Sequence, residues 1–163
     1  MRVLGIDPGS LVTGYGVVEE KVNGLQAVTW GVVRTTARQP LAERLQRIYD
    51  GLCKAVQTWQ PDAVSVEQVF FAENPKTALI LGHARGVALL TVAHAALPLV
   101  EYSALEIKLA VTGYGRAAKS QMQQMVKTLL GLDALPQPAD AADALAAAIC
   151  HLHTQRFNTR VSR

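Results

Sequence analysis

The sequence predicts an α/β fold, a five-stranded mixed sheet with helices on both faces. Near the start, short apolar runs alternate with turn signals; a helix-period pattern follows, and then strand-like and helix-like segments alternate. Strands joined by short turns pair antiparallel, whereas strands separated by helices can pair in parallel. The expected order is three strands, a helix, a strand, a helix, a strand and three helices.

The first three strands are expected to form an antiparallel meander. Val3–Ile6 is a short apolar run that ends in the turn Asp7–Ser10, and Gly14–Val18 continues into a second strand. Asn23 and Gly24 form a hairpin-type dipeptide, so residues 27–34 are expected to be the third strand.

A helix and a further strand should follow the meander. Apolar residues recur at spacings of three and four between Leu41 and Trp59, and Pro61 marks the end of that pattern. The apolar run Ala63–Val66 is then expected to be a strand with Glu67 at its end.

The next helix is predicted from about Pro75 to Ala96, with Asn74 as its cap. Much of its circumference is apolar, which predicts burial on more than one side. Residues 99–102 form the last predicted strand, and Ser103 with Glu106 has the pattern of a capping box for another helix.

Two helices complete the expected order. The first covers residues 119–130, and a linker containing proline leads to an alanine-rich final helix over residues 140–153. Residues 1–155 are expected to form a single domain, and residues 156–163 a flexible basic tail.

Composition narrows the class of protein. The 163 residues are 50% hydrophobic and 18% charged, which excludes an intrinsically disordered chain and favours one domain. The two cysteines, Cys53 and Cys150, exclude a disulfide scaffold and have no zinc-site spacing. No targeting signal or membrane span is apparent, so a cytoplasmic protein without membrane association is expected. The net charge of +3 is compatible with a polyanionic partner.

Four carboxylates are the candidate catalytic and metal-binding residues. Asp7 and Glu67 end the first and fourth strands, and Asp140 and Asp143 share a face at the start of the last helix. If the two strands are neighbours and the helix packs across their ends, all four converge. Hard oxygen ligands favour Mg²⁺ or Mn²⁺, and two such ions suit phosphodiester hydrolysis.

Each carboxylate also has an ordinary structural explanation. Asp7 precedes Pro-Gly-Ser and is a typical turn residue, and Glu67 is compatible with a solvated rim charge. Asp140 and Asp143 would complement the positive end of the helix dipole. The apolar residues around Glu67 and the small residues around Asp143 favour a functional role instead.

Four motifs together resemble the RuvC family of bacterial Holliday-junction resolvases, over residues 1–153. They occur in the family's order and spacing: Gly5–Ser10 with Thr13–Gly16, Val66–Phe70, Gly82–Gly86 and Asp140–Ala146. The resemblance implies a ribonuclease-H-like fold and a homodimer that cuts four-way DNA junctions, leaving 5′-phosphate and 3′-hydroxyl ends. It also implies work with the RuvA and RuvB branch-migration complex in recombination and DNA repair.

The resemblance assigns roles to individual residues. Asp7, Glu67, Asp140 and Asp143 match the family's acidic ligands, for two Mg²⁺ ions per subunit with Mn²⁺ as an alternative. The family's DNA-binding residues match Phe70, Lys108 and Lys119, and Arg85 and Arg116 are further DNA-binding candidates.

Alternatives remain for these residues. Phe70 is equally compatible with a core position, and Lys108 with an ordinary surface lysine. The small residues of Gly82–Gly86 suit either a dimer seam or packing on the chain's own sheet.

Two other function classes are compatible with parts of the sequence. The turn Asp7–Ser10 resembles that of actin-like and sugar-kinase-like phosphotransferases, although those proteins use two such domains around a nucleotide. A non-catalytic junction-binding protein is the second alternative, and loss of cleavage in an Asp7 variant would distinguish it.

Overall fold

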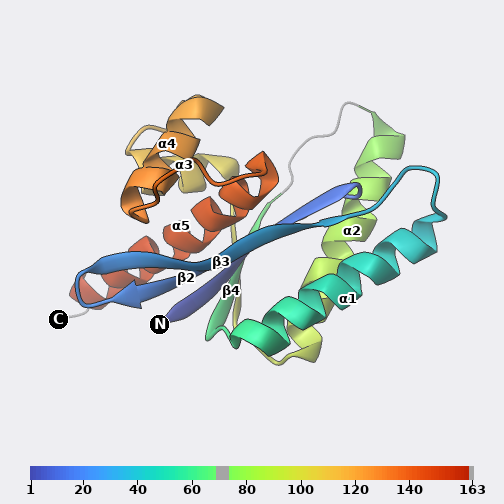
Figure 1. The fold of residues 1–163 in the computed structure, drawn as a ribbon, viewed down its shortest axis with the longest axis horizontal. Coiled ribbons are helices and arrows are strands. Elements are labelled where there is room, and N and C mark those ends of the chain that lie inside the picture. Colours follow the sequence, from blue (N-terminus) through green and yellow to red (C-terminus); the bar gives the residue numbers. More distant parts are fainter. Residues whose placement is uncertain (69–73, 162–163) are drawn as a thin grey trace.

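The computed structural model describes residues 1–68 and 74–161, with the side chains of Arg160 and Val161 excepted. Its elements alternate as the sequence predicts (Figure 1). In chain order they are β1 (Arg2–Asp7), β2 (Val12–Lys21), β3 (Gly24–Arg34), α1 (Leu41–Trp59), β4 (Ala63–Glu67), α2 (Pro75–His94), β5 (Leu99–Tyr102), α3 (Ala104–Thr112), α4 (Lys119–Leu129) and α5 (Ala139–Val161).

The five strands form one mixed sheet in the order β3-β2-β1-β4-β5. The first three strands pair antiparallel, and β4 pairs in parallel with both β1 and β5. The predicted meander and the predicted parallel strands are therefore confirmed. Because β1 and β4 are neighbours, the ends of these two strands lie side by side.

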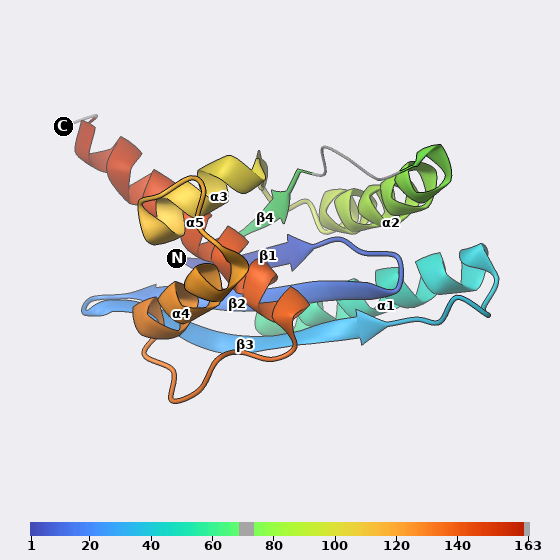
Figure 2. The same ribbon diagram turned by 90° about the horizontal axis from the view of Figure 1, so that it is seen from above.

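Helices cover both faces of the sheet. Alternate residues of a strand point to opposite faces, so Val3 packs with α3, α4 and α5, whereas Leu4 and Ile6 pack with α1 and α2. Figure 2 shows the sheet between these two groups of helices.

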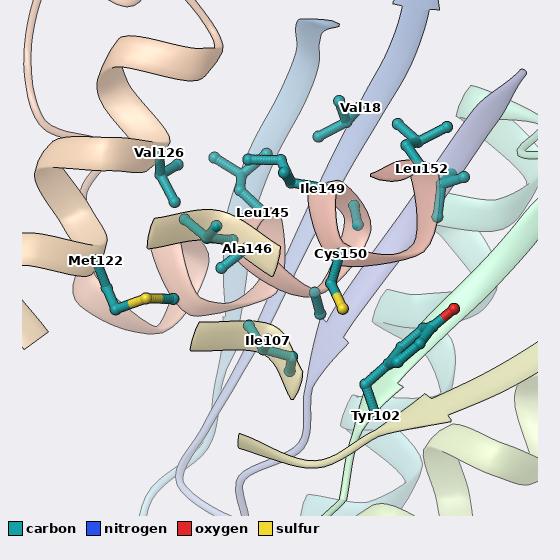
Figure 3. Close-up of a cluster of buried hydrophobic side chains, with 14 of the residues drawn as sticks. Val18, Tyr102, Ile107, Met122, Val126, Leu145, Ala146, Ile149, Cys150 and Leu152 are labelled. Carbon is teal, nitrogen blue, oxygen red and sulfur yellow. The ribbon is translucent and has the colours of Figure 1, made fainter. Parts of the chain in front are cut away.

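The core on the α5 face is centred on that helix. Leu145, Ile149 and Leu152 of α5 pack between Val18 of β2 and the apolar side chains of α3 and α4 (Figure 3). Several alanines of α5 are also fully buried, including Ala144 and the alanines at 147 and 148. An alanine-rich helix can approach a sheet closely, and this property positions the site.

The long helix α2 differs from the expectation that it is buried on more than one side. Only one stripe of it, which includes Ala84, Ala88 and Val92, is buried against the α1 face of the sheet. Leu79 and Leu90 are 66% and 49% exposed. In the described part of the chain α2 alone has the length and mean hydropathy, 1.2, of a membrane span. The helix α2 therefore has apolar side chains that packing within this chain does not bury.

The last helix is longer than predicted. It was expected to end near residue 153 and to give way to a loose tail at Arg156, but residues 156–161 continue α5. No glycine or proline interrupts this segment, and Arg156 forms an ion pair with Glu20 of β2. The contact with the sheet supports helical structure beyond the expected boundary.

Candidate active site

Asp7 and Glu67 are brought together by strand register. Ile6 of β1 pairs with Val66 of β4, so the next residues of both strands stand side by side at the carboxyl end of the sheet. The two-residue period places Asp7 on the same face as Gly5, and Glu67 on the same face as Ser65. This is the face that α5 covers, because Ser65 Oγ donates a hydrogen bond of 2.8 Å to the carbonyl oxygen of Ala147.

Glycines in β1 and β2 allow the start of α5 to lie directly on the sheet. A Cβ atom on Gly5 would stand 1.8 Å from the carbonyl oxygen of Ala144, and one on Gly14 would stand 2.0 Å from that of Asp140. Both distances are far below van der Waals contact, so the helix backbone occupies the space that side chains would need. The first turns of α5 are therefore held beside Asp7.

The four carboxylates form one electrostatic group around Asp7. Burial, together with the negative charges of Glu67, Asp143 and Asp140, raises the pKa of Asp7 to about 7, against the lowering effect of Lys119. Burial and Asp143 also raise the pKa of Glu67, against the lowering effect of two lysines. The arrangement therefore places more negative charge at this edge than its own cations neutralise.

A pocket of about 270 Å³ opens beside this group. It combines acidic, basic and apolar side chains, among them Glu67, Asp143, Lys108, Lys119, Ile107 and Met122. Lys119 Nζ donates a hydrogen bond of 2.8 Å to Asp143 Oδ2, and its side chain is 62% exposed. Glu67 and Asp143, two predicted ligands, thus share one pocket with the predicted DNA-binding residues Lys108 and Lys119. The charges of Asp143, Asp140 and Lys119 also act on Asp7.

The donor set suits a hard divalent cation. The residues are carboxylates, whose mutual repulsion a cation would relieve, and hard oxygen ligands favour Mg²⁺ or Mn²⁺ over zinc. Within residues 1–68 and 74–161, however, no group of three or more acidic, histidine or cysteine side chains is gathered closely enough to hold a metal ion. The carboxylates repel one another, and Lys108 and Lys119 offset only part of that repulsion. The site therefore has the chemistry of a metal centre with its oxygen ligands spread apart.

The remaining predicted DNA-binding residues fall in different places. Phe70 lies outside the described residues. Arg116 is exposed in the loop between α3 and α4, whereas Arg85 of α2 forms an ion pair with Glu101 of β5. The structure therefore gives Arg85 a partner within the protein and does not bring it to the pocket.

Sequence reasoning missed the part that glycines play in this site. It identified small residues around Asp143 as permitting close approach, but not the partners of that approach, Gly5 and Gly14. The available signal was a spacing of two residues: Gly5 is two residues before Asp7 in the first strand, and Gly14 is two residues before Gly16 in the second. A row of small residues on one face of a sheet indicates that a backbone lies against that face.

Lys119 provides a first test of the pocket. We expect Lys119→Gln to weaken DNA binding and to slow cleavage roughly tenfold or more, since about 1.4 kcal/mol corresponds to a factor of ten. The lysine is largely exposed, so its loss should change the free energy of unfolding by less than about 1 kcal/mol. Lys119→Arg keeps the charge and should keep binding. Equal DNA affinity of the Gln and Arg variants at low salt would rule out a phosphate contact.

Comparisons with known proteins identify the family of this chain. Residues 3–151 match the family model described as crossover junction endodeoxyribonuclease RuvC. The protein of that description from Syntrophotalea carbinolica is 53% identical, over 97% of this chain and 98% of the relative. The one from Desulforamulus reducens is 52% identical, over 93% of each chain. The structure of T. thermophilus RuvC in complex with Holliday junction substrate superposes with a TM-score of 0.91 at 36% identity, covering 98% of this chain and 97% of that one.

Proposed function

Since the chain belongs to the RuvC family of crossover junction endodeoxyribonucleases, we propose that it resolves Holliday junctions in homologous recombination and DNA repair. The reaction is a pair of symmetric nicks that leave 5′-phosphate and 3′-hydroxyl ends. The observation that carries the proposal is the gathering of Asp7, Glu67, Asp140 and Asp143 into one electrostatic group beside a pocket lined with lysines. We place this activity in the cytoplasm, where the chromosome of a bacterium lies.

In this proposal Asp7, Glu67, Asp140 and Asp143 hold two Mg²⁺ ions, or Mn²⁺ ions, in each subunit. When bound, the metal centre supplies Lewis-acid stabilisation and an activated water for phosphodiester hydrolysis. Lys108 and Lys119 line the same pocket and bind the phosphate backbone there. Ile107 and Met122 provide the apolar wall of the pocket and limit the access of water.

Symmetric nicks need two active sites related by a two-fold axis, and we propose that α2 forms the seam of a homodimer. The exposed side chains of Leu79 and Leu90 supply an apolar surface that packing within one chain leaves uncovered. A Cβ atom on Gly82 or Gly86 would meet nothing within 4 Å, so these positions are open to a second copy of the helix. We propose RuvA and RuvB as further partners of the dimer on the junction.

The seam predicts the behaviour of charged variants of α2. Leu79→Lys with Leu90→Lys should convert the dimer to a monomer, because two unpaired charges would have to be buried in the interface. Sedimentation measures the mass of the protein in solution. A junction assay that counts singly and doubly nicked products measures whether the two nicks occur together. Leu105→Lys changes an exposed leucine of α3 and serves as the matched control. A double variant that stays dimeric would place the seam elsewhere.

The direct test compares a mobile four-way junction with a linear duplex, each with and without Mg²⁺. We expect paired nicks in the junction only when Mg²⁺ is present, and no comparable cutting of the duplex. Junction binding without cleavage under any divalent cation would instead identify a non-catalytic binding protein.

A further inference from the structure

A second cavity lies on the other face of the sheet, between the edge strand β3 and α1. It measures about 570 Å³ and combines three basic side chains with two aromatic ones. Its polar and aromatic lining includes Arg34, Arg47, Lys54, Asp50, Tyr15 and Trp59. We call this cavity the β3–α1 groove.

The basic side chains of the groove have no partner in the described chain. Arg34, Arg47 and Lys54 are exposed, and none of them has an ion-pair partner within 4.0 Å or a side-chain hydrogen bond among residues 1–68 and 74–161. Asp50 is the single carboxylate of the described lining. The groove therefore concentrates uncompensated positive charge in a concave surface, which favours an anionic ligand.

The spacing of the charges fits a polymeric anion better than a small one. Arg47 and Lys54 are seven residues apart on α1, which corresponds to about 10 Å along the helix. A duplex rises about 3.4 Å per base pair along its axis, so this separation matches about three base-pair steps of a duplex that runs parallel to α1. Arg34 adds a third cation from the opposite wall of the groove.

The wall formed by β3 offers further hydrogen-bond donors. β3 is at the edge of the sheet, so one side of its backbone has no neighbouring strand within the described residues. Backbone N–H groups are common phosphate contacts in protein–DNA complexes. On the other wall, Gly51 brings α1 close to β3, since a Cβ atom there would stand 2.5 Å from a methyl group of Val33.

The groove also reaches the end of the sheet that holds the candidate active site. Asp7 of β1 pairs with Gly14 of β2, and Gly14 pairs with Val32 of β3, which lines the groove. Arg34 lies two residues further along β3. DNA that leaves the carboxylate edge can therefore pass the edge strand and continue along α1.

We propose that the β3–α1 groove binds the sugar–phosphate backbone of one duplex arm of the junction, away from the cut. This inference rests on the proposed function for the identity of the DNA, and it adds a second contact surface to that of the active-site pocket. The groove holds the arm by charge and reads no sequence, because its charged groups are suited to phosphates.

The test is the salt dependence of junction binding by the full-length protein in metal-free buffer. Each phosphate contact contributes about 0.9 to the slope of log affinity against log salt concentration. Arg47→Gln with Lys54→Gln should therefore reduce the slope by about two. Lys21→Gln with Lys127→Gln removes the same charge elsewhere and should leave the slope nearly unchanged.

Arm length provides an independent measurement. With arms about two helical turns long, the groove variant should bind more weakly than the control variant; with arms of about half a turn, the two should bind alike. A slope equal to that of the control would overturn the proposal. The basic residues of the groove would then be either solvated surface charges or a binding site for an acidic protein.

Cleavage separates this proposal from the proposed function. At saturating protein, the groove variant should cut a bound junction at the wild-type rate, because its substitutions lie outside the active-site pocket. Absence of cleavage by the wild-type protein would count against the resolvase function, whereas the slope measurement would still decide whether the groove binds DNA.

Discussion

We expect Asp7→Asn to abolish junction cleavage while leaving junction binding intact. The substitution keeps the shape of the side chain but removes the charge at the centre of the carboxylate group, where Glu67, Asp143 and Asp140 all act on Asp7. A metal-assisted hydrolysis that loses one ligand loses several kcal/mol of transition-state stabilisation. A loss of about 4 kcal/mol corresponds to a fall of about a thousandfold in rate.

The same substitution should not weaken the fold. Asp7 is a partly buried carboxylate whose negative neighbours disfavour its charged form, so a neutral amide relieves repulsion in the metal-free protein. We therefore expect the thermal unfolding temperature of metal-free Asp7→Asn to equal or exceed that of the wild type near neutral pH. A loss of cleavage caused by unfolding would show the opposite change.

Single-turnover cleavage and equilibrium binding on the same four-way junction distinguish the possible outcomes. Asp62→Asn is a matched control, because Asp62 contacts the backbone N–H of Arg2 at the other end of β1. Retention of Mg²⁺-dependent cleavage by Asp7→Asn would show that the metal site is elsewhere. Loss of both binding and cleavage would indicate that Asp7 holds the DNA rather than the metal.

The sequence was sufficient to predict the order of the elements, a mixed sheet, and Asp7 and Glu67 at the ends of two strands. Short turns identified the meander, and apolar runs between helices identified the parallel strands, because both signals are local. The pairing of β1 with β4 is not local: from the sequence it was only a condition for Asp7 and Glu67 to meet, and the structure supplies it.

What the sequence did not reveal depends on contacts between distant segments. The length of α5 depends on Arg156 meeting Glu20 of the hairpin, and the exposed stripe of α2 depends on how much of that helix the sheet covers. Arg85 was a candidate DNA-binding residue, but it forms an ion pair with Glu101, which lies on β5. Local periodicity carries no information about such pairings, so these features required the three-dimensional structure.

The close approach of α5 to the sheet gives the largest expected effect on stability. Gly5→Ala should destabilise the protein by about 3 kcal/mol or more and should remove cleavage. The new Cβ atom would stand 1.8 Å from the carbonyl oxygen of Ala144 and 2.9 Å from the backbone nitrogen of Ala148, and both are helix backbone atoms that no side-chain rotation can move. Overpacking of a core by one methyl group typically costs 1–3 kcal/mol, and here the helix itself must shift.

Gly31→Ala is the matched control for the same chemical change in a strand. Its Cβ atom would meet the hydroxyl end of Tyr15 at 2.7 Å, and a side chain of this length can move aside. Urea unfolding should therefore show a change in the free energy of unfolding below about 1 kcal/mol for Gly31→Ala. Equal stabilities of the Gly5 and Gly31 variants would contradict the close approach of α5.

Gly14→Ala separates the position of the helix from the stability of the fold. Its Cβ atom would meet the carbonyl oxygen of Asp140 at 2.0 Å, in the first turn of α5, and a helix end can adjust at lower cost than the helix interior. We therefore expect a folded variant whose cleavage falls by about a hundredfold, because a displacement of about 1 Å in a catalytic group has an effect of that size. Normal cleavage by folded Gly14→Ala would show that the position of Asp140 is not critical to the reaction.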